Sequence, residues 1–132
     1  MSLKGFQFSV VEAAIKKPGR KDLALIFSEC PAVAAAVFTT NAVKAAPVLL
    51  SAERIVSGKA QALVVNSGNA NACTGAQGML DARTTTHLVA EGLGIEEGLV
   101  QVCSTGVIGV PLPMDRLTSA RSEEHTSELQ SP

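Results

Sequence analysis

Thr105 and Gly106, in the segment STGVIG (residues 104–109), are the residues of this chain best suited to catalysis. Glycine lets a backbone N–H approach a reacting atom with no side chain in the way, and the neighbouring threonine adds a hydroxyl donor. Two donors that converge on one point form an oxyanion hole, which stabilises charge developing on a carbonyl oxygen. The pair therefore predicts acyl chemistry, although a simple turn accounts for the same residues.

A second polar segment, NSGNANACTG (residues 66–75), follows the apolar run 61–65 and holds three asparagines and two glycines. Both residue types tolerate the left-handed backbone conformation that tight loops need. Neither segment fits GxGxxG or GxxxxGK[ST], so a phosphate site is poorly supported. We expect the loop either to shape a ligand site or only to turn the chain.

Other reactive residue types have plainer interpretations. His87 lies within a helical pattern and is expected to be partly exposed and structural. Cys73 and Cys103 border the two polar segments, but no histidine is close in sequence to act as a base, so we expect small buried apolar residues. In the basic turn at residues 16–21, Lys16, Lys17 and Lys21 are expected to form a solvated surface.

Composition limits the class of protein. The 132 residues suffice for one domain, and 46% hydrophobic against 17% charged residues excludes a disordered chain. A formal net charge of −1 gives no reason to expect nucleic acid as a partner. Three scattered cysteines without CxxC spacing predict no metal site. With no signal peptide or apolar run of about 20 residues, we expect a cytoplasmic protein without membrane contact.

The last twelve residues, RSEEHTSELQSP (residues 121–132), differ in composition from everything before them. A frayed polar terminus is one interpretation. We prefer another, because the string resembles one reading frame of a common sequencing adapter. On this hypothesis residues 121–132 are a non-native tail, the native part is residues 1–120, and the natural chain continues beyond it.

The elements that must position these segments follow from apolar patterning. Strand patterns occur in five segments: residues 5–15, 22–28, 34–39, 61–65 and 99–103. Cys30-Pro31 is expected to break the second strand. Helical patterns occupy residues 47–56 and 77–91, and a third helix is expected to open at residues 111–115. The order predicts an α/β or α+β fold in which helices cover a sheet.

The apolar faces of the two helices can be predicted as well. In residues 47–56, Leu49, Leu50 and Ile55 can share a face. In residues 77–91, Leu80, Leu88 and Met79 are expected on the apolar side of the helix.

Six ordered blocks of sequence carry a resemblance to a known family: GFQF, IKKPGRKDLALI, AAVFTTN, KAAPVLL, QALVVNSGNANACTGAQG and STGVIGVPLPMD. The chain resembles the N-terminal part of the ornithine acetyltransferases of arginine biosynthesis, also called glutamate N-acetyltransferases (the bifunctional ArgJ family). The match covers nearly all of residues 5–120. One departure is Ala14, where glycine is expected.

The resemblance implies an N-terminal-nucleophile-like layered α/β sandwich of sheets and helices. It implies a precursor that cuts itself before a threonine into α and β chains, often assembled as α2β2. The new N-terminal threonine takes acetyl from N-acetylornithine and passes it to glutamate, with no cofactor; some members also use acetyl-CoA as the donor. Thr105 and Gly106 match the family's oxyanion-hole pair.

The family's cleavage motif and nucleophilic threonine lie downstream of residue 120, so the 132-residue chain alone is expected to be inactive. Two alternatives remain open on the sequence. One is a related self-processing aminopeptidase that uses water as acceptor. The other is a small, non-catalytic ligand-binding module.

Overall fold

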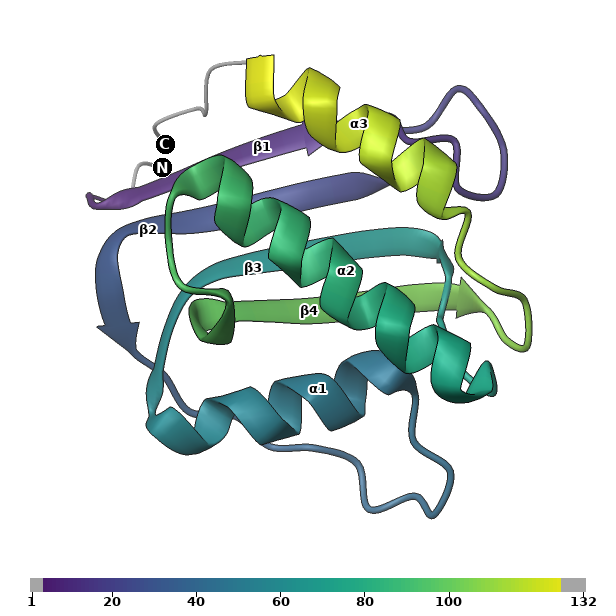
Figure 1. Ribbon diagram of the computed structural model, residues 1–132, viewed down its shortest axis with the longest axis horizontal. Helices are drawn as coiled ribbons and strands as arrows, with labels where there is room; N and C mark the ends of the chain where they lie inside the picture. Colours follow the sequence, from purple (N-terminus) through teal and green to yellow (C-terminus); the bar gives the residue numbers. More distant parts are fainter. Residues whose placement is uncertain (1–3, 127–132) are drawn as a thin grey trace.

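The computed structural model describes the backbone of residues 4–126 and the side chains of residues 4–120. The strands are β1 (Phe6–Val11), β2 (Leu23–Val33), β3 (Lys59–Asn69) and β4 (Val100–Val107). The helices are α1 (Ala46–Arg54), α2 (Gly75–Leu93) and α3 (Met114–Thr126), with 3₁₀ turns η1 (Ile55–Ser57) and η2 (Glu97–Leu99). Figure 1 shows their arrangement.

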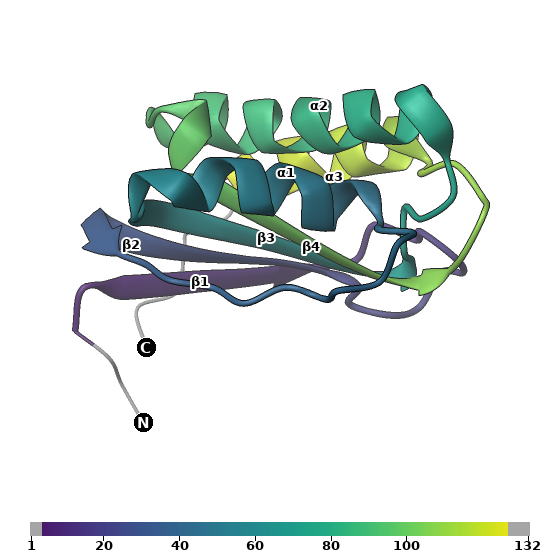
Figure 2. The ribbon, with the colours of Figure 1, turned by 90° about the horizontal axis from the view of Figure 1, so that it is seen from below.

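The four strands form one sheet in the order β1-β2-β3-β4. Neighbours pair antiparallel except β3 and β4, which are parallel and are joined through α2. All three helices lie on the same side of the sheet (Figure 2). The predicted mixed α/β fold is confirmed, with one sheet and one helical layer among the described residues.

The core lies between the sheet and the helices. Alternate residues of β3, such as Ala62 and Val64, are buried on the helical side, as a strand with one covered face requires. Leu50 of α1 and Val100 of β4 are fully buried there. The opposite side of the sheet, which we call the open face, exposes large apolar side chains: Phe6, Phe8, Val10 and Ile26.

Two predictions about β2 and the segment after it were wrong. β2 continues through Cys30 and Pro31 to Val33, because β1 pairs only as far as Ser28 and Pro31 therefore needs no ladder partner on that side. A register shift between Phe27 and Ala32 accommodates the change. Residues 34–39 form no strand; residues 34–38 line a cavity beside the open face, which accounts for their apolar character.

The two polar segments also begin differently from the prediction. β3 extends through Asn66 to Asn69, and β4 extends through Ser104 to Val107. Polar residues and glycine weaken a strand pattern in sequence, but here they continue the parallel β3–β4 ladder.

The predicted helix faces were partly wrong. Leu50 is buried, whereas Leu49 is 48% exposed and Leu80 is 57% exposed. The side of α2 toward the core instead presents small residues, including Gly78, Ala82 and Ala90. A Cβ at Gly78 would lie 2.7 Å from Oδ1 of Asn71, so this close packing excludes larger side chains.

Helix α3 begins at Met114, as predicted, and its backbone runs on through the first six residues of the suspected tail to Thr126. Residues 127–132 lie outside the described residues, so the adapter origin of residues 121–132 stays a prediction. Among the described helices, none is long and apolar enough to cross a membrane.

Candidate active site

Thr105 and Gly106 lie at the exposed end of β4, side by side with β3. The parallel register pairs Ser67 with Thr105 and Gly68 with Gly106. Two segments that the sequence singled out separately are therefore adjacent strands of one ladder. Both Thr105 and Gly106 are exposed, so a ligand can reach them.

Gly106 is confined by the strand beside it. A Cβ at this position would lie 2.3 Å from the carbonyl carbon of Gly68 and 2.4 Å from the amide nitrogen of Asn69. The backbone φ of Gly106 is +135°, in a region that L side chains rarely adopt. Only glycine fits, which leaves the backbone at residue 106 without a side chain to shield it.

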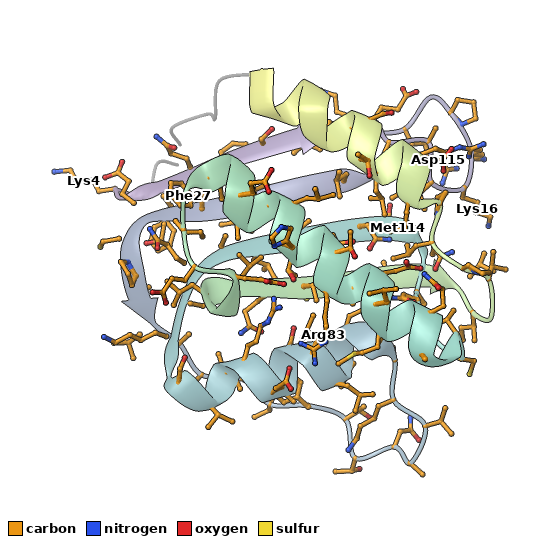
Figure 3. All side chains as sticks on the ribbon, viewed as in Figure 1. Lys4, Lys16, Phe27, Arg83, Met114 and Asp115 are labelled. Atoms are coloured by element: carbon orange, nitrogen blue, oxygen red, sulfur yellow. The ribbon has the colours of Figure 1, made fainter. Side chains whose placement is uncertain are left out.

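A cavity of about 490 Å³ contains this pair. It is lined by residues of β3, β4 and the β1–β2 turn: Lys16, Lys17, Arg20, Asp22, Ser67, Gly68, Thr105, Gly106 and Val107. Figure 3 labels Lys16 on that turn, at the end of the sheet where β4 ends. The volume falls in the range of small-molecule sites.

Asp22 anchors the β1–β2 turn against this cavity. Its buried carboxylate accepts hydrogen bonds from the backbone N–H groups of Ala13 at 2.7 Å and Ile15 at 2.8 Å. The Asp22 carbonyl accepts a third from the N–H of Ser67 at 2.9 Å. The Asp22 carboxylate thus closes the turn that carries the basic side chains, and the Asp22 carbonyl ties that turn to β3.

Ala14 occupies the position where the resemblance to the family leads us to expect glycine, and its backbone conformation accounts for that expectation. Its φ is +55°, in the left-handed region that disfavours residues with a Cβ. Nη1 of Arg116 donates a hydrogen bond to the Ala14 carbonyl at 2.6 Å. Alanine therefore holds a conformation at this position that glycine would adopt with less strain.

The three asparagines of NSGNANACTG are engaged with the chain itself. Nδ2 of Asn66 donates to the Asn69 carbonyl at 2.9 Å, and Oδ1 of Asn69 accepts from the N–H of Asn71 at 2.8 Å. Nδ2 of Asn71 donates to the Gly78 carbonyl at 2.9 Å. All three residues are buried. Gly68 of this segment lines the cavity, and the asparagine side chains connect the end of β3 to the start of α2.

The prediction that Cys73 and Cys103 are buried was wrong, because both are exposed. Cys73 lies in the turn before α2 with φ +56°, and Cys103 points to the open face. Partial burial still raises the pKa of the Cys103 thiol, which disfavours the thiolate.

His87 is 59% exposed and lies 3.5 Å from carboxylates of Glu91 and Glu97, in agreement with a structural role.

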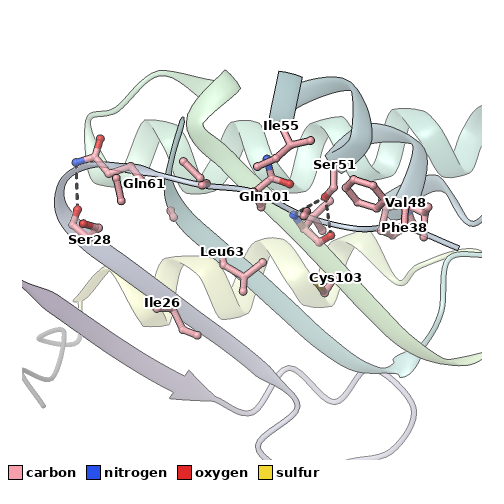
Figure 4. A pocket seen from close by; sticks show the side chains of 18 of the residues that line it. Ile26, Ser28, Phe38, Val48, Ser51, Ile55, Gln61, Leu63, Gln101 and Cys103 are labelled. Carbon is pink, nitrogen blue, oxygen red and sulfur yellow. Dashed lines mark hydrogen bonds between the residues drawn. The ribbon is translucent and has the colours of Figure 1, made fainter. Parts of the chain in front are cut away.

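A larger cavity of about 550 Å³ lies elsewhere, between the segment after β2, helix α1 and the open face (Figure 4). Its lining is mostly apolar and includes Ile26, Phe38 and Leu63. The buried Nε2 of Gln101 finds no hydrogen-bond partner among the described residues. The smaller cavity is the better candidate, because only it contains Thr105 and Gly106.

The basic turn is the feature that sequence reasoning missed. Lys16 and Lys17 were interpreted as solvated surface, and Arg20 was given no role, yet all three line the candidate cavity. The glycine at residue 68 is the feature of the sequence that relates to this contact. A Cβ added to Gly68 would lie 3.1 Å from Cβ of Lys16, so glycine permits close contact between β3 and the turn. Among the described side chains, no group of His, Cys, Asp and Glu could hold a metal ion.

Comparison with known proteins follows this geometry. The sequence model of the ArgJ family matches residues 7–130. The "Arginine biosynthesis bifunctional protein ArgJ" of Geobacter sulfurreducens is 71% identical over 117 residues, which are 89% of this chain and 30% of that protein. The protein of the same description from Caldanaerobacter subterraneus is 63% identical over 114 residues, 86% of this chain and 28% of its own length.

Two solved structures share the fold. The arginine biosynthesis bifunctional protein argJ of Bacillus halodurans superposes with a TM-score of 0.88 at 45% identity, over 98% of this chain and 66% of that one. The ornithine acetyltransferase of Mycobacterium tuberculosis, solved in complex with ornithine, gives 0.89 at 44% identity, over 96% and 68%. The chain spans about 30% of the length of the curated relatives.

Proposed function

The chain belongs to the ArgJ family, and we propose that it forms the N-terminal part of an acetyltransferase of arginine biosynthesis. The reaction moves acetyl from N2-acetyl-L-ornithine to L-glutamate. The observation that carries the proposal is the exposed Thr105–Gly106 pair in a cavity of about 490 Å³. Such a pair suits a reaction that develops charge on an acetyl oxygen.

The mechanism is covalent transfer in two steps. A threonine hydroxyl from the part of the enzyme after this chain attacks the acetyl carbonyl, and its own α-amine takes the proton. The C–N bond breaks, ornithine leaves with the proton, and an acetyl ester remains. The amine of glutamate then attacks the ester carbonyl, the bond from this carbon to the threonine oxygen breaks, a proton of the amine returns to that oxygen through the α-amine, and N-acetylglutamate leaves.

Thr105 and Gly106 act in both steps on the oxygen of the acetyl group. A hydroxyl and a backbone N–H at this place would donate to the negative oxygen of each tetrahedral intermediate. The contact between Gly106 and Gly68 fixes the backbone before the substrate arrives. A donor that is fixed beforehand needs no reorganisation during the reaction.

The open face supports the wider assembly that we propose. Phe6, Phe8 and Ile26 are between 38% and 42% exposed there, and they form an apolar surface that a second layer would cover. We propose that a β chain, released by self-cleavage of a precursor, supplies that layer, in an α2β2 enzyme of the cytoplasm. The reaction uses no cofactor, and acetyl-CoA is a second candidate donor of acetyl.

The test replaces Thr105 by alanine in the full-length enzyme. We expect kcat for transfer from N-acetylornithine to glutamate to fall about 10²- to 10³-fold, because one oxyanion donor is lost. Initial rates of ornithine release over both substrate concentrations give kcat and each KM. Thr40→Ala is the matched control, since Thr40 is exposed and lines neither cavity.

Two results would contradict the proposal at different points. A Thr105→Ala enzyme within about twofold of wild-type kcat removes Thr105 from the oxyanion hole. A wild-type full-length enzyme that releases acetate without acetylating glutamate is an aminopeptidase-like hydrolase instead. The 132-residue chain alone serves as the negative control, since it lacks the proposed nucleophile.

A further inference from the structure

The candidate cavity carries a concentration of positive charge that the acetyl-transfer step does not use. Lys16, Lys17 and Arg20 line one side of it, and among the described residues that line it Asp22 is the only acidic one. Both carboxylate oxygens of Asp22 accept backbone N–H groups, Oδ1 from Ala13 and Oδ2 from Ile15. The acid is thus occupied with holding the turn, and the cavity has an excess of positive charge.

The three basic side chains are available to a ligand. Among the residues whose side chains are described, Lys16, Lys17 and Arg20 form no ion pair, while Arg54 and Arg83 elsewhere do. All three are exposed, and the turn under them is fixed by Asp22 and by its contact with Gly68. Lysine and arginine held on a rigid backbone are the usual ligands of carboxylate and phosphate.

From this placement we infer that Lys16, Lys17 and Arg20 form an anion subsite beside Thr105 and Gly106, which binds a carboxylate or phosphate of the acetyl donor or acceptor. The inference rests on the proposed function for the identity of those compounds. It assigns a role in binding to a turn that sequence reasoning interpreted as solvated surface.

The chemistry of the substrates fits a subsite at this place. In an N-acetylated amino acid only the α-nitrogen and α-carbon separate the acetyl carbonyl from the α-carboxylate. A cavity that holds the acetyl oxygen at Thr105 and Gly106 therefore also holds that carboxylate. Glutamate adds a second carboxylate, and acetyl-CoA would bring phosphates instead, so each compound has an anion that the turn can bind.

The experiment compares the triple variant K16Q/K17Q/R20Q of the full-length enzyme with wild type at low ionic strength. Glutamine keeps most of the side-chain length and removes the charge. We expect KM to rise about tenfold for the compound whose anion is bound, with kcat within about threefold. Added salt should raise the wild-type KM toward that of the variant, because salt screens exposed charges.

Lys21→Gln is the matched control. Lys21 lies in the same basic segment but is absent from the cavity lining, so its KM values should equal those of wild type. The charge-conserving variant K16R/K17R/R20K should restore the wild-type KM. An equal thermal midpoint for all variants separates binding from folding.

The three substrates distinguish the source of the anion. A rise in KM for both N-acetylornithine and glutamate assigns the shared α-carboxylate, a rise for glutamate alone assigns its side-chain carboxylate, and a rise for acetyl-CoA alone assigns a phosphate. If the triple variant matches Lys21→Gln for all three, the subsite is refuted while acetyl transfer by wild type stands. If wild type transfers no acetyl group, the proposed function is refuted and the KM values cannot be compared. Direct titration of wild type and triple variant with glutamate then tests the subsite, and equal binding refutes it.

Discussion

At residue 106 the backbone of β4 approaches β3 so closely that a methyl group has no room. The nearest atoms are backbone atoms of Gly68 and Asn69, which cannot rotate away as the end of a side chain can. The position of Gly106 is therefore set by the sheet itself. A proposed backbone donor is held by the same contact that joins the two strands.

Replacing Gly106 by alanine should distort this contact and lower the free energy of unfolding by about 3 kcal/mol, through overpacking and an unfavourable φ. Thermal denaturation of the full-length enzyme would measure the change. Gly98→Ala is the matched control, because no atom lies within 4 Å of its Cβ position and its φ is not in the positive region. Equal midpoints for the two variants would show that the strands can separate locally at Gly106.

At the scale of elements, Arg54 joins α1 to β4 and to η2. Its side chain is 8% exposed, and it donates from Nη1 to the Val100 carbonyl at 3.0 Å and from Nη2 to Oε1 of Glu97 at 3.1 Å. Desolvation by burial lowers the pKa of Arg54, and Glu97 acts in the opposite direction. The guanidinium stays charged at neutral pH, since arginine titrates far above it.

Arg54→Met should lower the free energy of unfolding by about 2–3 kcal/mol, because it leaves the Val100 carbonyl and Glu97 without their donor. Arg83→Met removes a similar link, from Arg83 to Glu53 at 3.1 Å, but those side chains are 46% and 57% exposed. We expect that control to change stability by about 0–1 kcal/mol. Urea denaturation of both variants measures the difference, and a larger loss for Arg83→Met would contradict the assignment.

The sequence predicted those helices and strands in which one face is buried, because a buried face leaves a regular spacing of apolar residues. β1, α1, α2 and the first part of β3 follow from alternation or helical periodicity. It failed where position in the sheet overrides local preference: Pro31 is tolerated because β2 has lost its β1 neighbour there. It also failed at Leu80, because the packing of α2 at Gly78 and Asn71 calls for small residues.

The candidate site was predictable in part. Thr105 and Gly106 were singled out by residue type, and the structure places them together in a cavity. Their pairing with Ser67 and Gly68 was not visible, since nothing local reports that β3 and β4 are parallel neighbours. The basic side of the cavity depends on the hydrogen bonds of Asp22, which join residues seven and nine positions apart.

At the scale of the whole molecule, the reactivity of Cys103 on the open face should differ between this chain alone and the full-length enzyme. Its thiol is exposed in this chain, but burial raises its pKa, so less thiolate is present at a given pH than for an unperturbed cysteine. Alkylation by iodoacetamide should therefore be slower than for free cysteine near neutral pH, and its rate should rise at higher pH. Mass spectrometry across the alkaline range measures both effects.

In the full-length enzyme the proposed second layer would cover Cys103, and alkylation should become slower still. Cys30 and Cys73 are exposed as well, so the mass shift is followed on the peptide that holds Cys103, and Cys103→Ser should abolish that shift alone. Alkylation as fast as that of free cysteine near neutral pH would contradict the raised pKa. An equal rate in the full-length enzyme would contradict the covering layer.

The parallel pairing of β3 with β4 also has a consequence for the order in which the molecule is made. The contact between Ser104 and Asn66 joins residues 38 positions apart, with the whole of α2 between them. As the ribosome extends the chain, Gly68 appears long before Gly106, so the cavity floor cannot close until α2 has emerged and folded back. Contacts of this separation form late. Pairing of β4 with β3 is therefore the step on which assembly of the cavity depends.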